Sequence, residues 1–204
     1  MYFARFPRCS DSFLRYRKVL HTPAIRGIPK LSRQNQKILA FKGKMESIKG
    51  AKQLKQNGAG LNVVVIRTGW NQKVVDPLVE GCIKELKDSG VTKIELIEVP
   101  GAYELPFACK TVIQGDPSVN AVIAIGCLIK GDTMHFEYIC ESVSHGLMQV
   151  GLDTGVPVIF GVLTCLTEMQ ALQRAGVEPG HHNHGPEWGA AAIVMANLKK
   201  QKRG

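Results

Sequence analysis

Residues Ile125 to Ile139 read IGCLIKGDTMHFEYI, an apolar strand that ends in a glycine-bearing turn and leads into a helix. The first turn of that helix carries His135. A helix start offers unpaired backbone N–H groups and the positive end of the helix dipole, which favour a bound anion. Because histidine gains and loses protons near neutral pH, the stretch predicts an anion site beside a proton carrier. Turn formation and helix capping are the alternative reason for its Gly, Asp and Thr residues.

Outward from this stretch, strand-like and helix-like segments alternate along the chain. Apolar, β-branched segments predict strands at 61–67, 93–99, 121–128 and 157–163. Helical spacing predicts helices at 74–88, 103–114, 167–175 and 187–200. A further helix begins near His135 and turns an apolar stripe to the core, formed by Phe136, Ile139, Cys140, Val143, Leu147 and Val150. The dipeptide Asp76-Pro77 indicates a helix restart. The alternation predicts an α/β fold, a parallel sheet covered on both faces in three α/β/α layers.

Polar or aromatic residues follow each predicted strand. They are Trp70-Asn71, Gly101 to Glu104, Lys130 to His135, and Thr164. In parallel α/β sheets, ligands bind beyond the carboxyl ends of the strands. We therefore expect these four segments to lie along one edge of the sheet.

Two of these side chains, and Arg174 further along the chain, have both a functional and a structural interpretation. An indole at Trp70 is suited to stack on a flat heterocycle, or else packs a loop onto the domain. Glu104 is suited to accept hydrogen bonds from sugar-like hydroxyls, or else complements the dipole of its helix. Arg174, at the end of a helix, is suited to grip a phosphate, or else complements the helix C-terminus.

Two further features qualify the anion site and a suspected metal site. A carboxylate repels phosphate, so we expect the side chain of Asp132 to point away and leave the backbone N–H groups to bind. The run His181-His182-Asn183-His184 resembles a metal cluster. No further Cys, His or acid stands at zinc spacing near it, so a polar loop is expected and no metal is predicted.

The formal net charge of +9 comes from the first 44 residues. Of 26 basic and 17 acidic residues, eleven and one lie in this segment, which leaves fifteen and sixteen for the rest. An Arg-rich, hydroxyl-bearing and acid-poor segment is typical of a mitochondrial transit peptide. Translation that starts at Met45, or a basic nucleic-acid-binding arm, are the alternatives. The near-neutral remainder argues against nucleic acid as a partner.

The cysteines and the hydropathy of the chain point to the inside of a cell. Six cysteines show no C-x-x-C pair and several lie in apolar runs, so we expect reduced, mostly buried thiols. No apolar run reaches the length of about 20 residues that a membrane helix needs, and no membrane partner is predicted. The expected compartment is mitochondrial if residues 1–44 are a transit peptide, and otherwise cytoplasmic.

With these residues in view, the chain resembles the lumazine synthase family of riboflavin biosynthesis. The resemblance runs from about Leu61 to Lys200 and rests on five ordered blocks: Trp70-Asn71, PGAYELP at 100–106, GCLIKGDTMHFEYI at 126–139, VIFGVLT at 158–164 and QRAG at 173–176. It implies a flavodoxin-like fold with a catalytic domain at 61–204. Residues 1–44 then form an N-terminal extension, and residues 45–60 a flexible lead-in.

The family joins 5-amino-6-(ribitylamino)uracil to 3,4-dihydroxy-2-butanone 4-phosphate. The products are 6,7-dimethyl-8-ribityllumazine, phosphate and water, and no metal or organic cofactor takes part. The resemblance therefore implies an enzyme with two small-molecule substrates. A non-catalytic flavin- or lumazine-binding module on the same fold is the alternative, because a fold does not decide a function.

The resemblance also implies roles for individual residues. Trp70 stacks on the pyrimidine ring, Glu104 takes the ribityl hydroxyls and His135 carries protons. The ring pocket further includes Asn71, Ala102, Tyr103, Cys127, Leu128, Ile129 and, from a neighbouring subunit, Phe160. Phosphate is expected at Gly131, Asp132 and Thr133, together with Arg174 of a neighbouring subunit, and Lys130 and His184 are further candidates.

The run HNHGPEWGAAA at 182–192 resembles the fungal branch of the family. The chain departs from many members in having Gly69 where they have Arg, and His184 where bacterial members have Lys. The loop 177–183 is longer than in bacterial members. Fungal members share the longer loop and form rings of five subunits, so we expect a homopentamer with active sites between subunits.

Overall fold

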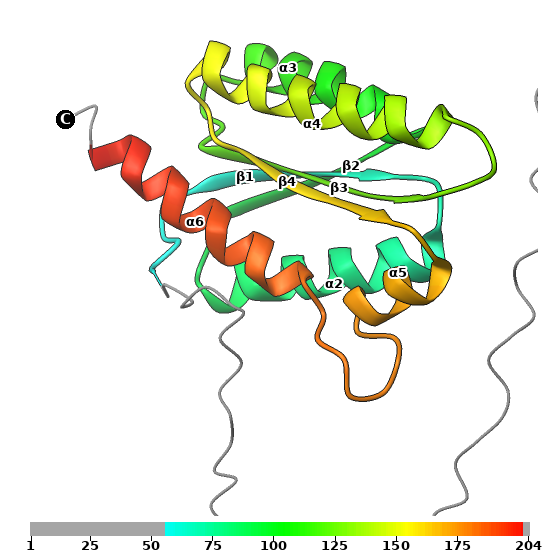
Figure 1. The fold of residues 1–204 in the computed structure, drawn as a ribbon. Coiled ribbons are helices and arrows are strands. Elements are labelled where there is room, and N and C mark those ends of the chain that lie inside the picture. Colours follow the sequence, from blue (N-terminus) through cyan, green and yellow to red (C-terminus); the bar gives the residue numbers. More distant parts are fainter. Residues whose placement is uncertain (1–55, 202–204) are drawn as a thin grey trace, which may run out of the picture. The chain divides into compact units, whose positions relative to one another are not determined.

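In the computed structural model, which describes residues 56–201, four parallel strands form one sheet between two layers of helices (Figure 1). The strands are β1 (Asn62–Thr68), β2 (Lys93–Val99), β3 (Ala121–Ile129) and β4 (Val158–Cys165), in the order β2-β1-β3-β4. The helices are α2 (Gln72–Asp88), the 3-10 turn η1 (Ala102–Glu104), α3 (Leu105–Gly115), α4 (His135–Thr154), α5 (Glu168–Arg174) and α6 (Gly185–Gln201). The predicted α/β fold with a parallel sheet is confirmed.

The two central strands are buried because helices cover both of their faces. Alternate residues of a strand point to opposite faces of the sheet. Thus Val63 and Val65 pack with residues of α2 and α6, whereas Val64 and Ile66 pack with residues of α3 and α4. Figure 1 shows α3 and α4 above the sheet and α2, α5 and α6 below it. Two separate apolar cores therefore fix the sheet between its helical layers.

Helices α2 and α6 approach each other at glycines. A Cβ placed on Gly185 would lie 2.1 Å from the carbonyl oxygen of Leu78, and one on Gly189 would lie 3.0 Å from that of Cys82. Side chains at these positions would hold the two helices apart. Helix α6 begins at Gly185, two residues before the predicted start, and the Gly185 N–H donates to Asn183 Oδ1 at 2.7 Å.

Helix α2 is continuous through Pro77, so the predicted restart at Asp76-Pro77 is wrong. The carbonyl oxygen of Asn71 accepts hydrogen bonds from Val74 N–H at 2.8 Å and Val75 N–H at 2.9 Å, and this starts the helix before the proline. A proline removes one backbone hydrogen bond from a helix. Near the helix start that loss is tolerated, because the flanking turns remain bonded.

Strand β4 is two residues longer at its end than predicted. Leu128 pairs with Thr164, and Ile129 pairs with Cys165. Because β3 also continues past its glycine to Ile129, the two strands extend together, and Thr164 lies within β4 instead of after it. The other three predicted segments do follow the carboxyl ends of their strands.

The predicted helix at 103–114 begins as the single 3-10 turn η1 before α3 starts at Leu105. Helix α4 buries only part of its predicted stripe. Val143, Leu147 and Val150 are buried, but Phe136, Ile139 and Cys140 are half-exposed. Phe136 and Ile139 line the cavity at the carboxyl ends of the strands, and Ile139 also packs against the core.

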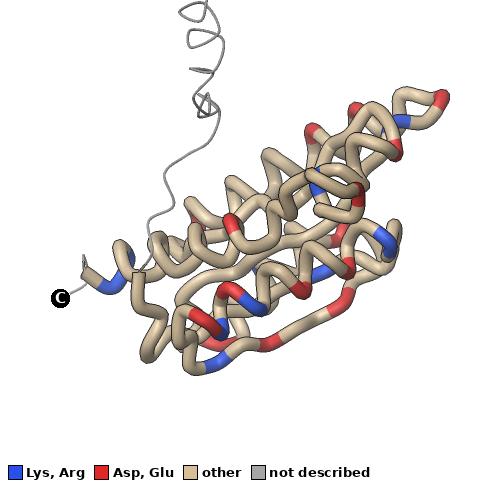
Figure 2. The backbone as a smooth tube through the Cα atoms, turned by 90° about the horizontal axis from the view of Figure 1, so that it is seen from below, with Lys and Arg blue, Asp and Glu red and all other residues tan. Residues whose placement is uncertain are grey.

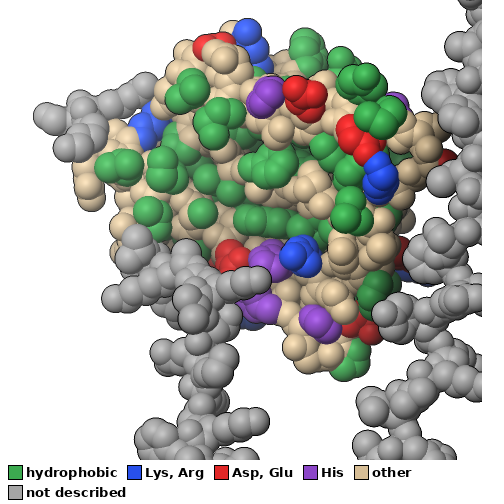
Figure 3. Space-filling view, in the orientation of Figure 1, with side chains coloured by type: hydrophobic (Ala, Val, Ile, Leu, Met, Phe, Trp, Pro, Cys, Tyr) green, Lys and Arg blue, Asp and Glu red, His purple; other side chains and the backbone are tan. Residues whose placement is uncertain are grey.

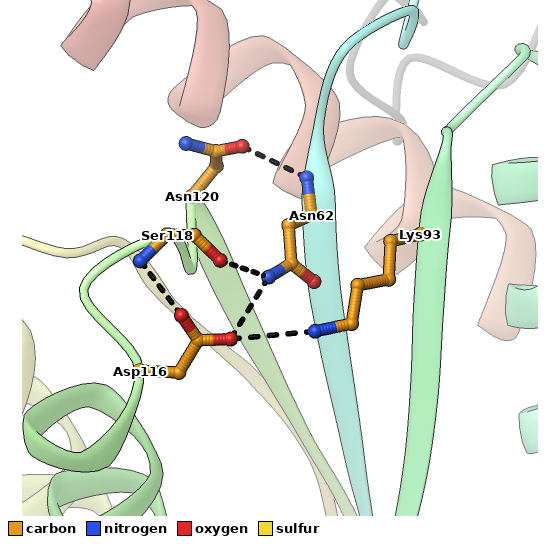
Figure 4. Close-up of polar contacts among 5 residues, drawn as sticks. All are labelled: Asn62, Lys93, Asp116, Ser118 and Asn120. Atoms are coloured by element: carbon orange, nitrogen blue, oxygen red, sulfur yellow. Dashed lines mark hydrogen bonds and ion pairs between the residues drawn. The ribbon is translucent and has the colours of Figure 1, made fainter.

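The amino ends of the strands are joined by a polar cluster (Figure 4). Asn62 Nδ2 donates to Ser118 Oγ at 2.8 Å and to Asp116 Oδ2 at 3.3 Å. The backbone N–H of Asn62 donates to Asn120 Oδ1 at 2.8 Å. Lys93 forms an ion pair with Asp116 at 3.4 Å. The cluster ties β1 and β2 to the loop before β3, at the edge opposite the predicted site.

The N-terminal extension 1–44 and residues 45–55 of the expected lead-in lie outside the described residues. The described end of the lead-in is bonded to the domain. Gly58 N–H donates to the carbonyl oxygen of Ser89 at 2.7 Å, and Gly60 N–H donates to Thr92 Oγ1 at 2.7 Å. In Figure 2 basic and acidic positions are interspersed over the visible helices, as the near-neutral charge of this part of the sequence leads us to expect.

Candidate active site

A cavity of about 700 Å³ lies at the carboxyl ends of β1, β2 and β3. Its lining unites three of the predicted segments. The residues are Thr68, Trp70, Asn71, Gly101, Ala102, Tyr103, Glu104, Cys127, Leu128, Ile129, Gly131, Thr133, His135, Phe136 and Ile139. The indole of Trp70 and the imidazole of His135, which come from different βα units, thus face one cavity. This is the arrangement that a site at the sheet edge requires.

The turn that carries Trp70 is held at both of its ends. Gly69 N–H donates to the carbonyl oxygen of Val99 at 3.0 Å, at the end of β2. Asn71 Nδ2 donates to the carbonyl oxygen of Cys127 at 2.9 Å, on β3. Trp70 itself is 69% exposed, so its ring is available to a ligand instead of being packed into the core.

Glu104 lies beside Trp70 across a glycine. A Cβ on Gly101 would be 3.0 Å from Glu104 Oε2 and 3.8 Å from both Cδ1 and Nε1 of the Trp70 indole. Gly101 therefore leaves the space in which a carboxylate and an aromatic ring meet. A carboxylate beside an indole is suited to a ligand that combines a flat ring with hydroxyl groups.

The loop between β3 and α4 presents free backbone donors to the cavity. The backbone N–H groups of residues 131–133 have no hydrogen-bond acceptor among residues 56–201. His135 is the first residue of α4, and its own N–H makes a long contact of 3.4 Å with Thr133 Oγ1. Gly131 and Thr133 line the cavity, but Asp132 between them does not. Free N–H groups at the start of a 20-residue helix are suited to an anion.

An ion pair joins the two ends of this loop. Lys130 pairs with Glu137 in the first turns of α4, and the Lys130 ammonium lies 5.7 Å from the centre of the Phe136 ring. Lys130 N–H also donates to the carbonyl oxygen of Cys165 at 2.9 Å, which fixes the loop to β4. Lys130 is not among the residues that line the cavity.

The cysteine of the cavity is a poor nucleophile. Burial, and then the neighbouring thiol of Cys165, together raise the pKa of Cys127 to about 12. Burial also raises the pKa of Cys165. Both thiols are therefore protonated at neutral pH, since the thiolate is the reactive form. Cys82, Cys109 and Cys140 are also free thiols, as the sequence predicts; Cys9 lies outside the described residues.

Besides Lys130 and Asp132, three predicted site residues lie outside this cavity. Phe160 is 41% exposed on β4 and borders a hollow beside Phe136. Arg174 ends α5, and its carbonyl oxygen accepts a hydrogen bond from His184 N–H at 3.1 Å. His184 Nδ1 lies 2.8 Å from Glu187 Oε2. Within one chain, these residues do not meet Trp70 and His135.

The histidine run forms a polar loop. His182 Nε2 lies 3.2 Å from Glu187 Oε1, so His182 and His184 share one carboxylate. Within the described part of the chain, no group of three His, Cys, Asp or Glu side chains is arranged to hold a metal ion.

Sequence reasoning missed three residues of the cavity lining: Thr68, Phe136 and Ile139. Thr68 is 1% exposed, and its Oγ1 has no partner among the described residues. A Thr that ends a strand gave no signal by itself. Phe136 and Ile139 were assigned to the core because the helical stripe continues through them.

Several known proteins that are similar to this chain share one name. A family model described as 6,7-dimethyl-8-ribityllumazine synthase matches residues 60–200. A protein of that name from Schizosaccharomyces pombe is 48% identical over 151 residues, which cover 72% of this chain and 94% of that protein. A protein of the same name from Pyricularia oryzae is 41% identical, and the match covers 72% of this chain and 92% of that protein. One from Streptomyces avermitilis is 46% identical, and the match covers 72% of this chain and 91% of that protein. The chain therefore belongs to the 6,7-dimethyl-8-ribityllumazine synthase family, transferases of riboflavin biosynthesis.

Proposed function

We propose that the cavity between β1, β2 and β3 is where this chain condenses 5-amino-6-(ribitylamino)uracil with 3,4-dihydroxy-2-butanone 4-phosphate. One observation carries the assignment of the site. Trp70, Glu104, the free N–H groups of Gly131 and Thr133, and His135 all border the same space. A ring shelf, a hydroxyl acceptor, an anion cradle and a proton carrier are what this reaction needs from a protein.

The ribitylaminouracil occupies the side of the cavity that Trp70 and Glu104 form. The exposed indole stacks on the pyrimidine ring, while the Glu104 carboxylate accepts hydrogen bonds from the ribityl hydroxyls. Backbone groups supply the remaining polar contacts to the ring, since Ala102, Tyr103 and the end of β3 from Cys127 to Ile129 line the same space. The side chain of Asn71 is already bonded to Cys127, so its Oδ1 is the atom left for a ligand.

The phosphate of the second substrate lies at the start of α4. Gly131 and Thr133 provide N–H donors, and the dipole of the long helix favours the negative charge. Asp132 does not line the cavity, and it takes part through its unbonded backbone N–H and not through its carboxylate. Its carboxylate therefore does not oppose the anion at close range.

His135 moves the protons of each step. The amine attacks the ketone carbonyl to give a carbinolamine, which loses water to form an imine. Phosphate then leaves, the second amine closes the ring, and a further water is lost. Every step adds or removes a proton, which suits an imidazole because its ring nitrogens can both donate and accept a proton. Much of the acceleration comes from holding the two substrates together.

We further propose that a neighbouring subunit completes the site. Phe160 and Arg174 lie outside the cavity of their own chain, so a second copy must bring them to the ring and the phosphate. The surface that would meet it is apolar. Figure 3 shows hydrophobic side chains across the face between α4 and α6, where the exposed apolar residues are Met148, Leu152, Phe160, Met195 and Leu198.

A patch of this kind marks an interface. In a closed ring with head-to-tail contacts, every subunit buries this apolar face against its neighbour. We propose that the ring is a homopentamer. Sedimentation of the full chain tests it. A species of five subunits is expected, while a large shell or an active monomer contradicts the proposal.

The experiment that tests the reaction mixes both substrates with the protein. Formation of the lumazine chromophore together with release of inorganic phosphate is the expected result. Binding of lumazine or flavin without either product would identify a non-catalytic binding module instead. Replacing the ketone phosphate by its unphosphorylated analogue is the matched control, since it leaves the anion cradle empty.

Residues 1–44 are proposed to be a separate targeting extension, with the catalytic domain at 61–204. Support comes from the match of the family model, which begins at residue 60. N-terminal sequencing of protein from its native source tests this, because a transit peptide is absent from the mature chain. Retention of residue 1 would contradict it. Among the described residues, no helix has the length and apolar character that a membrane crossing needs.

A further inference from the structure

Asn71 has a left-handed backbone, with φ 56° and ψ 44°. It is the only non-glycine residue with positive φ among residues 56–201. Asparagine tolerates this conformation better than most residues, but it still costs on the order of 1 kcal/mol. An interaction that requires this left-handed backbone therefore offsets its cost.

That interaction is not helix capping. Asn71 occupies the N-cap position of α2, where an Asn side chain ordinarily accepts a hydrogen bond from the helix N–H groups. Here the side chain makes no such bond. Its Nδ2 instead donates to the carbonyl oxygen of Cys127 at 2.9 Å, across from β1 to β3. The side chain thus joins two strand ends that both line the cavity.

The position of Trp70 depends on this link. On one side of Trp70, Gly69 N–H donates to Val99 on β2. On the other side, Asn71 is bonded to Cys127 on β3. The indole is 69% exposed, so packing alone does little to hold it. The two hydrogen bonds, one to each neighbouring strand, are what set the direction of the Cα–Cβ bond of Trp70.

We propose that Asn71 is a positioning residue whose hydrogen bond to the Cys127 carbonyl orients the Trp70 indole before substrate binds. The inference rests on the proposed function in one respect: the ring that stacks on the indole is the pyrimidine of the ribitylaminouracil. The link itself exists in the ligand-free chain. An indole that is already oriented loses less conformational entropy when the substrate binds.

Two variants separate the link from the backbone conformation. Asn71→Asp keeps size and shape, but a carboxylate cannot donate to the Cys127 carbonyl. Asn71→Gly keeps the left-handed backbone without strain and removes the side chain. The matched control is Asn197→Asp at the other edge of the sheet. Asn197 Nδ2 likewise donates to a backbone carbonyl, that of Asn57, at 3.0 Å.

The measurement is fluorine NMR of the full, ligand-free chain labelled with 5-fluorotryptophan. The chain has two tryptophans, and Trp70→Phe assigns the two resonances. Both Asn71 variants are expected to shift and broaden the Trp70 resonance and to leave that of Trp188 in place. Asn197→Asp is expected to change neither. In turnover, the KM for the ribitylaminouracil should rise about 10-fold, with kcat within about 3-fold of the parent.

An unchanged Trp70 resonance in both Asn71 variants overturns the proposal, even if KM rises. A direct contact between Asn71 and substrate would raise KM alone, without any effect on the free protein. The Trp188 resonance reports whether each variant is folded, and Asn71→Gly decides the matter if Asn71→Asp does not fold. A parent chain that makes no lumazine would refute the proposed function, yet the ligand-free spectra would still test the link.

Discussion

Gly101 and Glu104 are matched so that the carboxylate occupies the space a side chain at residue 101 would take. A Cβ on Gly101 would lie 3.0 Å from Glu104 Oε2, closer than an unstrained contact. The backbone of Gly101 is extended, at φ −152° and ψ −178°, so any residue can adopt it. The requirement for glycine there is one of space and not of conformation.

Gly101→Ala should therefore displace the Glu104 carboxylate without unfolding the chain. We expect the KM for the ribitylaminouracil to rise about 10-fold, equivalent to about 1.4 kcal/mol, with a smaller change in kcat. Steady-state kinetics with that substrate varied measures it. Gly115→Ala is the control, because nothing lies within 4 Å of a Cβ there. Equal effects of the two substitutions would contradict the assigned role of Glu104.

His135→Ala should slow turnover by roughly 10²-fold and leave measurable activity. Holding the two substrates together does not need the imidazole, and water can replace it as a slower proton carrier. Lumazine formation under single-turnover conditions is the measurement. Complete loss of activity in a folded, assembled variant would mean that His135 does more than carry protons.

Arg174→Ala and His135→Ala should complement each other if two chains build each site. Mixed rings contain sites in which one subunit supplies His135 and its neighbour supplies Arg174. Random pairing makes about a quarter of the sites intact in a ring of head-to-tail contacts. Activity is measured after the two variants are unfolded together and refolded. A mixture no more active than the mean of its components would place Arg174 outside the shared site.

Thr68→Val should stabilise the protein by about 1 kcal/mol, since it removes a buried hydroxyl that has no partner among the described residues. The two side chains have nearly the same shape. Urea unfolding of the parent and the variant measures the difference. Thr111→Val serves as the control, because the Thr111 hydroxyl donates to the carbonyl oxygen of Phe107 at 2.9 Å on an exposed face. A loss of stability in Thr68→Val would reveal a hydrogen bond at Thr68 Oγ1.

Asp116 should make the polar cluster of Figure 4 sensitive to acid. Hydrogen bonds from the Ser118 side chain and backbone, and then Lys93, lower the pKa of Asp116 to about 2. The unfolded value is about 3.9, so the stabilisation is fully present above roughly pH 4 and is lost as the pH falls toward 2. Asp116→Asn should flatten the acid limb of the stability curve. In a carboxyl titration by NMR, Ser118→Ala should raise the pKa of Asp116 more than Lys93→Ala does.

Most of the fold follows from local patterns. The strands at 93–99 and 121–129 are continuous apolar or alternating runs between turn residues, and the structure places them within one residue of the prediction. The boundaries that failed are those set by distant contacts. Strand β4 runs on because β3 pairs with it as far as Cys165. Helix α6 starts at Gly185, whose N–H donates to Asn183 Oδ1, while Asn183 Nδ2 donates to the carbonyl oxygen of Pro77 in α2.

The cavity was predicted as a set of segments and not as a shape. Parallel strands bring their carboxyl ends to one edge, so Trp70, Glu104 and His135 were expected together from the order of the elements alone. Their exact neighbours were not. Phe136 and Ile139 continue the apolar stripe of α4. This periodicity is the same whether the residues face the core or a cavity, so it does not distinguish the two.

The sequence by itself determined the parallel α/β fold and the edge of the sheet at which the cavity opens, because periodicity and turn residues act over short distances along the chain. Its motifs identified the family. Only the tertiary structure decided that Asn71 bonds to Cys127, that Gly101 makes room for Glu104, and that Phe160 and Arg174 lie outside their own cavity. These relationships join residues of different elements. They arise from how the elements pack, and no local pattern encodes that packing.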